Sequence, residues 1–296
     1  MEGAGFERRR PPIARNPVSH SSVITLTTDF GLADPYVATM KGVILSLNPA
    51  ATIVDITHQV RPQQVAQAAF LLAQALPYFP SGTIHVVVVD PGVGTARRAL
   101  ALGTPEMLLV GPDNGVLSAA LPDETRRRAL PGPDSMSVDL PEGYRAVALR
   151  RGRYTRTPVS ATFHGRDIFA PAAAHLSLGV ELEALGPAVK KIQALPPFRA
   201  ARRLPDGALE GRVVHVDRFG NVVTDVRAED LRTGRVEVTI GGQRIEGLAQ
   251  TYEGEPDMKA LVGSAGYLEV ACRGGSAVER LGVDIGDAVL VRERAG

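Results

Sequence analysis

Four polar clusters in the sequence contain side chains that could carry out chemistry. They are 27–34 (TTDFGLAD), 90–98 (DPGVGTARR), 111–115 (GPDNG) and 162–167 (TFHGRD); the first three follow short apolar runs and the fourth precedes an apolar helix pattern. Their carboxylates, guanidinium groups and single imidazole can hold a water molecule, orient it and move its proton. The sequence has neither the Gly-x-Ser-x-Gly motif of a serine nucleophile nor a His-Glu-x-x-His metal helix. We therefore expect any catalysis to use Asp, Arg and His.

Each cluster also has a structural interpretation. Asp34 precedes a proline and could cap the next helix, whereas Asp29 lies on the strand side, where a carboxylate could accept hydrogen bonds from ribose hydroxyls. The cluster at 90–98 could be a tight turn closed by an Asp–Arg ion pair. Its two glycines form neither a Walker loop nor a full dinucleotide fingerprint. The dipeptide Asn114–Gly115 by itself indicates a turn.

Two further features could contact a ligand. A lone histidine is usually structural, but His164 lies at the expected entrance of a helix, beside a glycine and among polar neighbours. Nearer the C-terminus, the segments 217–222 (DRFGNV) and 264–269 (SAGYLE) are typical of hairpins. An aromatic ring next to an amide, here Phe219 and Asn221, could instead stack on a nucleobase and bond to its edge.

The elements expected to position these clusters alternate between strand and helix. β-Branched runs predict strands at 23–27, 51–56, 83–89 and 107–110, and helical spacing of apolar residues predicts helices at 36–47 and 65–76. This alternation predicts an α/β domain with a mostly parallel, Rossmann-like sheet and helices on both faces. Such sheets carry their binding groups in loops at the carboxyl ends of strands, where the clusters lie.

The periodicity changes toward the C-terminus. A Pro/Gly/Arg-rich stretch at 121–158 holds one expected strand, 144–149, and precedes a helix at 168–178. Short alternating strands follow at 211–216, 221–226, 236–240, 243–246, 267–271 and 288–292, and they predict a smaller all-β, barrel-like domain. The predicted organisation is a disordered tail at 1–20, an N-terminal α/β domain at 21–192, a linker at 193–208 and the β domain at 209–296.

Composition excludes several classes of protein. The 296 residues are 44% hydrophobic and 22% charged, and 33 Lys and Arg balance 32 Asp and Glu to a net charge of +1. No strongly basic domain indicates nucleic acid or an anionic membrane as partner, the arginines at 8–10 fit a solvated tail, and no apolar run is long enough to span a bilayer. The single cysteine, Cys272, permits no intramolecular disulfide, so a reducing cytoplasm is expected.

Five motifs in one order carry a resemblance to a known family. They are TTDFGLADPYV (27–37), DPGVGTAR (90–97), PDNGVL (112–117), TFHGRDIFAPAAAHL (162–176) and DRFGNVVT (217–224). From about Ile24 to Val291 the chain resembles the S-adenosyl-L-methionine (SAM) hydroxide adenosyltransferase family, the SAM hydrolases related to fluorinating and chlorinating enzymes. Each motif alone is short, whereas the ordered set spans both expected domains.

The resemblance implies that water or hydroxide attacks C5′ of SAM and displaces methionine to give adenosine, with no metal and no cofactor. It assigns catalysis to Asp90, Arg97 and His164. Arg97 orients and electrostatically favours the nucleophile, while Asp90 and His164 fix the water and move its proton. Because a sulfonium is a good leaving group, such a site mainly has to place and partly desolvate one nucleophile.

The resemblance also implies a substrate site shared between subunits of a homotrimer. Asp29 matches the carboxylate on the ribose diol, Phe219 and Asn221 match the adenine contacts, and Asp217 and Ser264 would meet the amine and carboxylate of methionine. The same set includes Asp34, Asn114, Phe163 and Gly165. The segment that begins at Asp217 is one residue shorter than in the halogenating enzymes, and Ala265 stands where the fluorinating enzyme has an arginine.

Three alternatives to metal-independent hydrolysis of SAM remain at the level of the sequence. Halogenating relatives have Tyr at the position of Asp90, and the fluorinating enzyme has Ser where this chain has Gly165, although the chlorinating relative has Gly. A carboxylate repels a halide and accepts a hydrogen bond from water, so Asp90 favours hydrolysis. The chain could instead bind SAM or adenosine without turnover, or be a metal-dependent hydrolase that uses Asp29, Asp90, Asp113 and His164.

Overall fold

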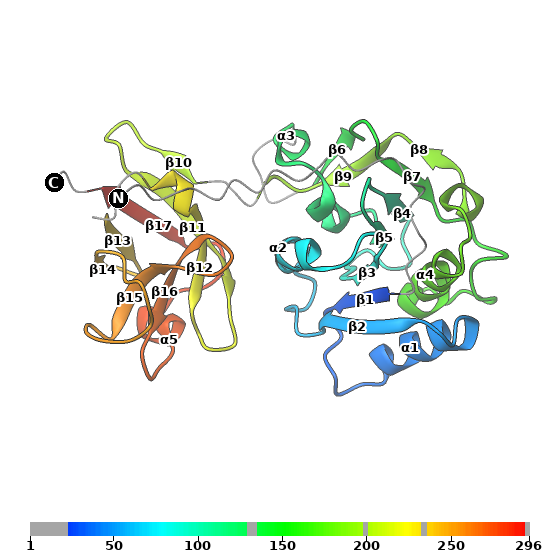
Figure 1. Ribbon diagram of the computed structural model, residues 1–296, viewed down its shortest axis with the longest axis horizontal. Coiled ribbons are helices and arrows are strands. Elements are labelled where there is room, and N and C mark those ends of the chain that lie inside the picture. The colour runs from blue at the N-terminus through cyan, green and yellow to red at the C-terminus, as the bar shows by residue number, and fades with distance from the viewer. Residues whose placement is uncertain (1–22, 129–134, 198–200, 232–235, 294–296) are drawn as a thin grey trace, which may run out of the picture.

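The computed structural model describes residues 23–128, 135–197, 201–231 and 236–293, and the tail expected at 1–20 lies outside these ranges. Its N-terminal part is built on a seven-stranded sheet in the order β2-β1-β3-β5-β4-β7-β8 (Figure 1). The strands are β1 (Val23–Thr28), β2 (Thr52–Thr57), β3 (Ile84–Val88), β4 (Ala99–Gly103), β5 (Leu108–Pro112), β7 (Arg145–Ala148) and β8 (Ala188–Val189). The helical elements packed on it are α1 (Tyr36–Leu47), α2 (Val65–Ala75), α4 (Ala170–Ser177) and the 3₁₀ turn η2 (Val116–Ala120).

The expectation of a mostly parallel sheet is wrong, because this sheet is mixed. β1 pairs parallel with β2 and β3, and β3 pairs parallel with β5. By contrast β4 lies antiparallel to β5 and β7, and β8 lies antiparallel to β7. Only residues 104–107 connect β4 to β5, which suffices for a hairpin, whereas a parallel pair needs a crossover of about a dozen residues or more. β4 is not among the strands that the sequence predicts.

Helices cover both faces of the sheet, as expected. α1 and α4 pack on one face, and α2 with η2 packs on the other (Figure 1). Residues of β3 show the division, because Val86 and Val88 join the first core cluster and Val87 joins the second. Side chains alternate across a strand, so the all-apolar sequence of β3 matches burial on both sides. None of the helices in the described ranges has both the length and the apolarity that a membrane span requires.

The C-terminal part is an antiparallel, barrel-like sheet, as expected. Its main path runs β14-β13-β17-β11-β12-β16-β15, with β10 paired to β11. Alternate residues of β13, namely Val236, Val238 and Ile240, point into its core. The strands are β10 (Arg202–Arg203), β11 (Leu209–Val216), β12 (Val222–Arg227), β13 (Val236–Ile240), β14 (Gln243–Glu246), β15 (Met258–Val262), β16 (Tyr267–Cys272) and β17 (Ala288–Glu293), and the short helix α5 spans Ala277–Leu281.

The chain between the two parts carries regular structure. β6 (Met136–Asp139) pairs antiparallel with β9 (Lys191–Ala194), so the range 193–208 expected as a linker contains the end of β9 and all of β10. The buried Arg126, at the end of the short helix α3 (Asp123–Arg126), donates from Nη2 to the carbonyl oxygen of Pro196 at 2.6 Å. This contact ties the connection to the N-terminal part.

Contacts along α2 join the two parts. Phe70 of α2 lies against Tyr267 of β16 with ring centroids 5.2 Å apart, and both side chains are buried. Gln67 donates from Nε2 to Nδ1 of His215 at 3.1 Å. The apolar contact and the polar contact beside it hold the β part against α2.

A buried histidine makes the stability of the fold depend on pH. His85 in β3 has no exposed surface, and burial lowers its pKa to about 4 from the ordinary 6.5. Between these two values the unfolded chain binds more protons than the folded one, so stability is fully present above pH 6.5 and decreases on acidification. For this group alone we expect the free energy of unfolding to fall by about 3 kcal/mol between pH 6.5 and pH 4.

Urea unfolding at the two pH values tests this expectation. Other titrating groups contribute to both proteins, so the comparison is between the natural chain and His85→Gln. The variant should lose about 3 kcal/mol less on acidification than the natural chain. An equal loss in both proteins would contradict the assignment to His85.

Candidate active site

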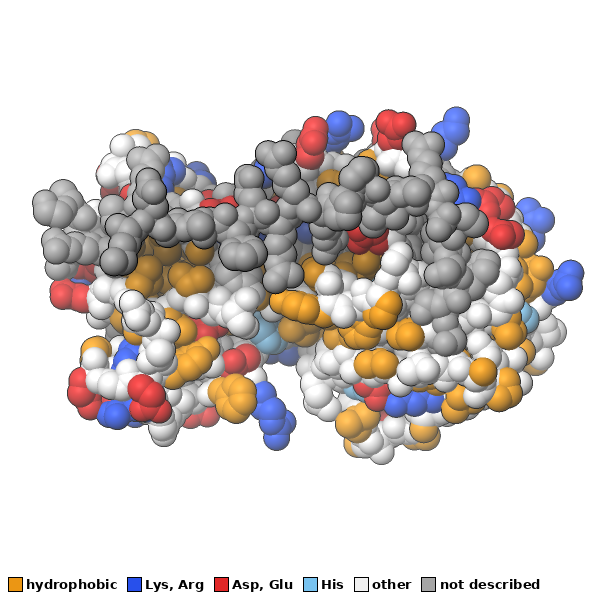
Figure 2. Space-filling model, viewed as in Figure 1, with side chains coloured by type: hydrophobic (Ala, Val, Ile, Leu, Met, Phe, Trp, Pro, Cys, Tyr) orange, Lys and Arg blue, Asp and Glu red, His pale blue; other side chains and the backbone are white. Residues whose placement is uncertain are grey.

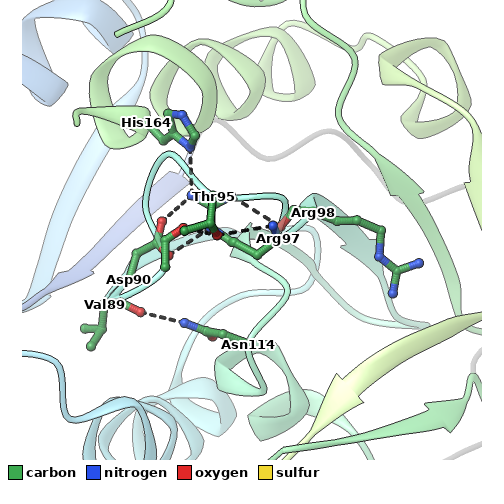
Figure 3. A network of polar contacts seen from close by, with 8 residues as sticks. Val89, Asp90, Thr95, Arg97, Arg98, Asn114 and His164 are labelled. Atoms are coloured by element: carbon green, nitrogen blue, oxygen red, sulfur yellow. Dashed lines mark hydrogen bonds and ion pairs between the residues drawn. The ribbon is translucent and has the colours of Figure 1, made fainter. Parts of the chain in front are cut away.

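Three side chains singled out in the sequence form one hydrogen-bonded network. Asp90 closely follows β3, Arg97 lies in the following loop, and His164 reaches them from a segment far along the chain (Figure 3). Arg97 donates from Nε to Oδ1 of Asp90 at 2.8 Å and from Nη2 to Oδ2. The same Nη2 lies 2.7 Å from Nδ1 of His164. The Asp90 and Arg97 side chains are only 5% and 10% exposed, so little solvent screens their charges from a ligand.

A glycine brings the loop of Arg97 against the segment that leads to His164. Gly94 has a φ of +78°, and a Cβ atom added there would lie 2.3 Å from the carbonyl oxygen of Ala161. Glycine alone accepts both this backbone conformation and this close approach. Close packing at the site therefore explains Gly94, the second glycine of the motif DPGVGTAR.

Asp167, to which the sequence analysis assigned no role, holds the segment that carries His164. Its fully buried carboxylate accepts hydrogen bonds from Nε and Nη2 of Arg166 at 2.7 and 2.8 Å, and from the backbone N–H of Ser160 at 2.9 Å. The backbone here makes one π-helical turn, Gly165–Phe169, a form that is frequent at functional sites. The signal in the sequence is the place of Asp167 at the end of TFHGRD, directly after an arginine.

The surroundings of His164 favour a neutral imidazole. Burial lowers the pKa of His164 below its ordinary 6.5, and the positive charge of Arg97 lowers it further. Because a guanidinium can only donate, Nδ1 accepts and the network assigns the proton of the neutral ring to Nε2. Nε2 is buried and has no hydrogen-bond partner among the described residues. Buried donors are nearly always paired, so Nε2 marks a place for a ligand atom.

A cavity of about 390 Å³ lies beside this network, a volume within the range of small-molecule sites, roughly 300–1,000 Å³. It lies where β1 and β3 end. The segment before α2 and the segment around His164 form the rest of its wall. Its lining residues are Asp29, Phe30, Tyr36, Pro62, Gln63, Val88, Asp90, Pro91, Val93, Thr162, Phe163, His164 and Gly165. Of the predicted site residues, Asp29, Phe163 and Gly165 therefore share one cavity with Asp90 and His164.

The carboxylate of Asp29 is held at the wall of the cavity. Its Oδ2 accepts a hydrogen bond from the backbone N–H of Gln63 at 2.8 Å. Gln63 has a φ of +66°, and among the described residues it is the only one other than glycine with a positive φ. Such a conformation costs about 1–2 kcal/mol and is characteristic of binding sites. This bond orients Oδ2 and leaves the second oxygen, Oδ1, to accept from a ligand.

Aromatic rings line the same cavity. The ring centroids of Phe30, Tyr36 and Phe163 lie between 5.1 and 6.0 Å from one another. Gly165 is closely packed beside them, since a Cβ atom there would lie 3.0 Å from Sδ of Met40. Rings of this kind offer apolar surface to a nucleoside and a negative face to a cation such as a sulfonium.

Three predicted residues of the N-terminal part do not line the cavity: Asp34, Asn114 and Arg97, of which Arg97 is hydrogen-bonded to Asp90 and His164 in its wall. Asp34 is exposed. Asn114 donates from Nδ2 to the carbonyl oxygen of Val89 at 2.9 Å and accepts from the backbone N–H of Val116 at 3.2 Å (Figure 3). Asn114 thereby holds the chain between β3 and Asp90, which is a positioning contact.

Asp113, a ligand in the metal-dependent alternative, is engaged by the fold. Its Oδ2 accepts from Nε of Arg98 at 2.7 Å, and its Oδ1 accepts from the backbone N–H of Gln193 at 2.7 Å. Across the part of the chain that the structure describes, no three His, Cys, Asp or Glu side chains are grouped so that they could hold a metal ion. The arrangement of the predicted ligands therefore does not support that alternative.

The predicted residues of the C-terminal part lie away from the cavity of their own chain. Asp217 accepts from the backbone N–H groups of Phe219 and Asn221 at 2.8 and 2.9 Å, and from Nδ2 of Asn221 at 2.9 Å, so it shapes this turn. Phe219 is 78% exposed and Ser264 is also exposed. Figure 2 shows one face of the molecule, on which acidic and basic side chains are scattered over both parts. None of these four residues lines the cavity. Within one chain, the structure assembles the N-terminal half of the predicted site only.

Comparison with family models covers both parts of the chain. The SAM hydroxide adenosyltransferase N-terminal domain matches residues 24–186, and the corresponding C-terminal domain matches residues 211–290. The chain belongs to the SAM hydroxide adenosyltransferase family. The Asp90–Arg97–His164 network and the cavity lie in the first matched domain, and Phe219, Asn221 and Ser264 lie in the second.

Curated proteins with similar sequences are named as SAM hydrolases and, at lower identity, as fluorinases. A protein of Thermus thermophilus named (R)-S-adenosyl-L-methionine hydrolase is 45% identical, over 88% of this chain and 95% of its own length. A protein of Salinispora tropica with the same name is 42% identical, over 90% of this chain and 97% of its own length. A fluorinase of an Actinoplanes species is 26% identical over 73% of this chain and 75% of its own.

Solved structures match the fold. An uncharacterized conserved protein from Thermotoga maritima superposes with a TM-score of 0.77 and 33% identity, covering 92% of this chain and all of the other. A conserved hypothetical protein from Thermus thermophilus superposes with a TM-score of 0.66 and 39% identity, covering 91% of this chain and 99% of the other. The two-part architecture is thus shared with experimentally solved members of the fold.

Proposed function

We propose that this protein hydrolyses S-adenosyl-L-methionine to adenosine and L-methionine, and that it acts on the (R) sulfonium epimer named in its relatives. The observation that carries the proposal is the Asp90–Arg97–His164 network beside a cavity that also contains Asp29 and Phe163. The test is incubation of the purified protein with each separated SAM epimer, with chloride and EDTA present. We expect adenosine and methionine from the (R) epimer.

The reaction balances with water as the only co-reactant. The water oxygen forms a bond to C5′, the C5′–S bond breaks, and its electron pair leaves with sulfur as the neutral thioether of methionine. One proton is released. Arg97 stabilises negative charge as the nucleophile approaches a hydroxide-like state, the Nε2–H of neutral His164 donates a hydrogen bond that holds the water in line, and the carboxylate of Asp90 accepts the proton of the water. No step requires a metal ion or a cofactor.

The carboxylate of Asp90 supports water over halide as the nucleophile. It stands at the wall of the cavity where halogenating relatives have a tyrosine, and its side chain is only 5% exposed. A halide within contact distance of a shielded carboxylate is repelled by on the order of a kcal/mol or more, whereas water donates a hydrogen bond to it. The positive charge of the paired Arg97 reduces this repulsion. The carboxylate still occupies its space at the cavity wall and still accepts hydrogen bonds.

The remaining substrate contacts follow the family pattern. Asp29 binds the ribose diol through Oδ1, and Phe163 and Gly165 flank the nucleoside. Asp34 lies in the same loop as Asp29, and Asn114 acts indirectly by positioning the chain before Asp90. Phe219 and Asn221 contact adenine, and Asp217 and Ser264 face methionine, whose carboxylate meets Ala265 in place of an arginine. The free Cys272 is consistent with an enzyme of the reducing cytoplasm.

We further propose that the active enzyme is a homotrimer in which one subunit supplies the cavity and the next supplies the C-terminal contacts. Phe219 is 78% exposed, and the C-terminal contact residues are absent from the cavity of their own chain, which supports a shared site. Asp90→Asn and Phe219→Ala damage different halves of such a site. Mixed assemblies of the two impaired variants should be more active than either variant alone, whereas a fully active monomer would contradict the proposal.

Replacing Asp29 should affect binding more than chemistry. A ribose-diol contact acts about equally in the ground and transition states, so Asp29→Ala should raise KM about 10-fold or more and change kcat only a few-fold. Steady-state kinetics measure both, with the exposed Asp139→Ala as the control for loss of a carboxylate. An unchanged KM with a collapsed kcat would contradict the assigned role.

Activity should fall on the acid side because His164 must be neutral. Its pKa lies below 6.5, so the imidazole is neutral at pH 7, and acidification through that pKa protonates Nδ1 and breaks its contact with Arg97. We expect kcat at saturating SAM to be constant down to about pH 6.5 and to decline below it. A decline that begins well above pH 6.5 would contradict a lowered pKa.

A further inference from the structure

A second cavity, of about 370 Å³, shares no lining residue with the first. It lies between the segment that follows β7 and the segment that leads into β8, whose short 3₁₀ helix η4 spans Leu182–Leu185. β7 and β8 pair through Ala146 with Val189, so the two walls of the cavity are held by the sheet. The proposed hydrolase reaction does not use this cavity.

Positive charge dominates the cavity wall. Arg150, Arg151 and Arg153 line it, and none of them forms an ion pair with any residue in the ranges that the structure describes. The one acidic lining residue, Glu183, is engaged by Arg145, whose Nη1 lies 2.6 Å from its Oε1. Three exposed arginines thus line one concavity whose single carboxylate is already paired, an arrangement whose like-charge repulsion an anion would relieve.

The backbone around the arginines is fixed. The N–H of Arg150 donates to the carbonyl oxygen of Leu185 at 3.0 Å. Gly186 passes so close to the opposite wall that a Cβ atom there would lie 1.9 Å from the carbonyl oxygen of Ala148. Beside them, the guanidinium of Arg153 lies 5.4 Å from the ring centroid of Tyr154. The arginines therefore extend from a rigid base, which lowers the entropic cost of binding a ligand.

We propose that this cavity is a binding site for a small phosphate-bearing anion. Guanidinium forks match the oxygens of phosphate groups, and several of them favour a multiply charged group over a single carboxylate. The substrate and products of the proposed reaction do not match this site, because none of them is a net anion: SAM carries a net positive charge, adenosine is uncharged and methionine is a net-neutral zwitterion. The site is therefore separate from the catalytic cavity, and the binding proposal does not depend on the hydrolase proposal.

Two histidines report on the charge of this site. Burial lowers the pKa of His175, and the positive charge of Arg153 lowers it further. Burial and the charge of Arg97 are the main causes that lower the pKa of His164; Asp90 opposes them, and the charge of Arg151 adds a smaller lowering effect. A bound anion would compensate these arginines and raise both pKa values. If the hydrolase proposal also holds, the acid limb of kcat moves to higher pH when the site is occupied.

Calorimetric titration of the full-length protein with inorganic pyrophosphate, and separately with inorganic phosphate, tests the binding. We expect saturable binding of one pyrophosphate per chain, stronger than that of phosphate, and at least about 10-fold weaker in the double variant Arg151→Ser/Arg153→Ser. The matched control is Arg127→Ser/Arg128→Ser, which removes the same charge from exposed arginines outside the cavity. In parallel, pyrophosphate should raise the pKa of His175 measured by NMR and leave that of His85 unchanged.

Several results would overturn the proposal. One is the absence of saturable pyrophosphate binding. Another is an equal loss of pyrophosphate affinity in both double variants, which would mean a general effect of charge. A third is binding of a single-stranded RNA oligomer without binding of pyrophosphate. Hydrolysis of SAM at pH 8 should be the same in Arg151→Ser/Arg153→Ser and the natural chain. This assay separates failure of the anion site from failure of the proposed catalytic function.

Discussion

Asp90→Asn should lower the rate of SAM hydrolysis at saturating substrate by about 10²-fold or more. The substitution keeps the size of the side chain and one acceptor oxygen, but it removes the negative charge that accepts two hydrogen bonds from Arg97. An amide holds water less strongly and is a far weaker proton acceptor. Binding of SAM should survive, because the role proposed for Asp90 concerns the nucleophile and not the substrate.

The chain offers a matched control for this variant. Asp113 is also an aspartate at a strand end, is also buried, and is also paired with an arginine, Arg98, but it does not line the cavity. Asp113→Asn should therefore retain hydrolysis within a few-fold. At high chloride, Asp90→Asn alone is expected to release a trace of 5′-chloro-5′-deoxyadenosine, since the repulsion of an anion is gone. A rate for Asp90→Asn close to that of Asp113→Asn would limit Asp90 to a structural pair with Arg97.

Arg97→Lys should lower kcat by about 10² to 10³-fold although it keeps the positive charge. One guanidinium contacts both carboxylate oxygens of Asp90 and Nδ1 of His164, and a lysine ammonium on a flexible chain cannot reproduce this planar set of contacts. The expected loss is in the transition state, so KM should change little. Arg97 also lies 5.4 Å from the ring centroid of Phe169, a packing contact that lysine would weaken.

Arg98→Lys is the control for this second variant. Arg98 is the next residue of the same loop and pairs with Asp113, so its replacement perturbs the loop without touching the network. Thermal unfolding of both variants separates a loss of folding from a loss of catalysis. Equal kcat values for Arg97→Lys and Arg98→Lys would show that charge alone suffices at Arg97.

The proximity of the residues in the N-terminal half of the candidate site could be predicted, because it depends on a simple rule of sheets. Asp29 and Asp90 follow strands β1 and β3, which pair in parallel, so their carboxyl ends meet at one edge. The sequence pattern therefore placed these residues together without any knowledge of side-chain geometry. His164 joined them through its motif and its place before an apolar helix.

The mixed character of the sheet could not be predicted in the same way. The segment ALALG of β4 is short and lacks β-branched residues, so its periodicity does not distinguish a strand from a helix. Its pairing with β5 and β7 is decided by tertiary contacts. The local hydrogen bonds of Asn114 and Asp217 were equally hidden, because short polar side chains bond to nearby backbone in ways that depend on the turn formed.

Hydrolysis of SAM in water labelled with heavy oxygen tests the central claim most directly. If water activated by Asp90, Arg97 and His164 attacks C5′, mass spectrometry will find one labelled oxygen in each adenosine at the 5′ position and none in methionine, with EDTA present throughout. Adenosine that carries no label, or a 5′-halogenated product as the main species in the presence of chloride, would contradict the proposed reaction.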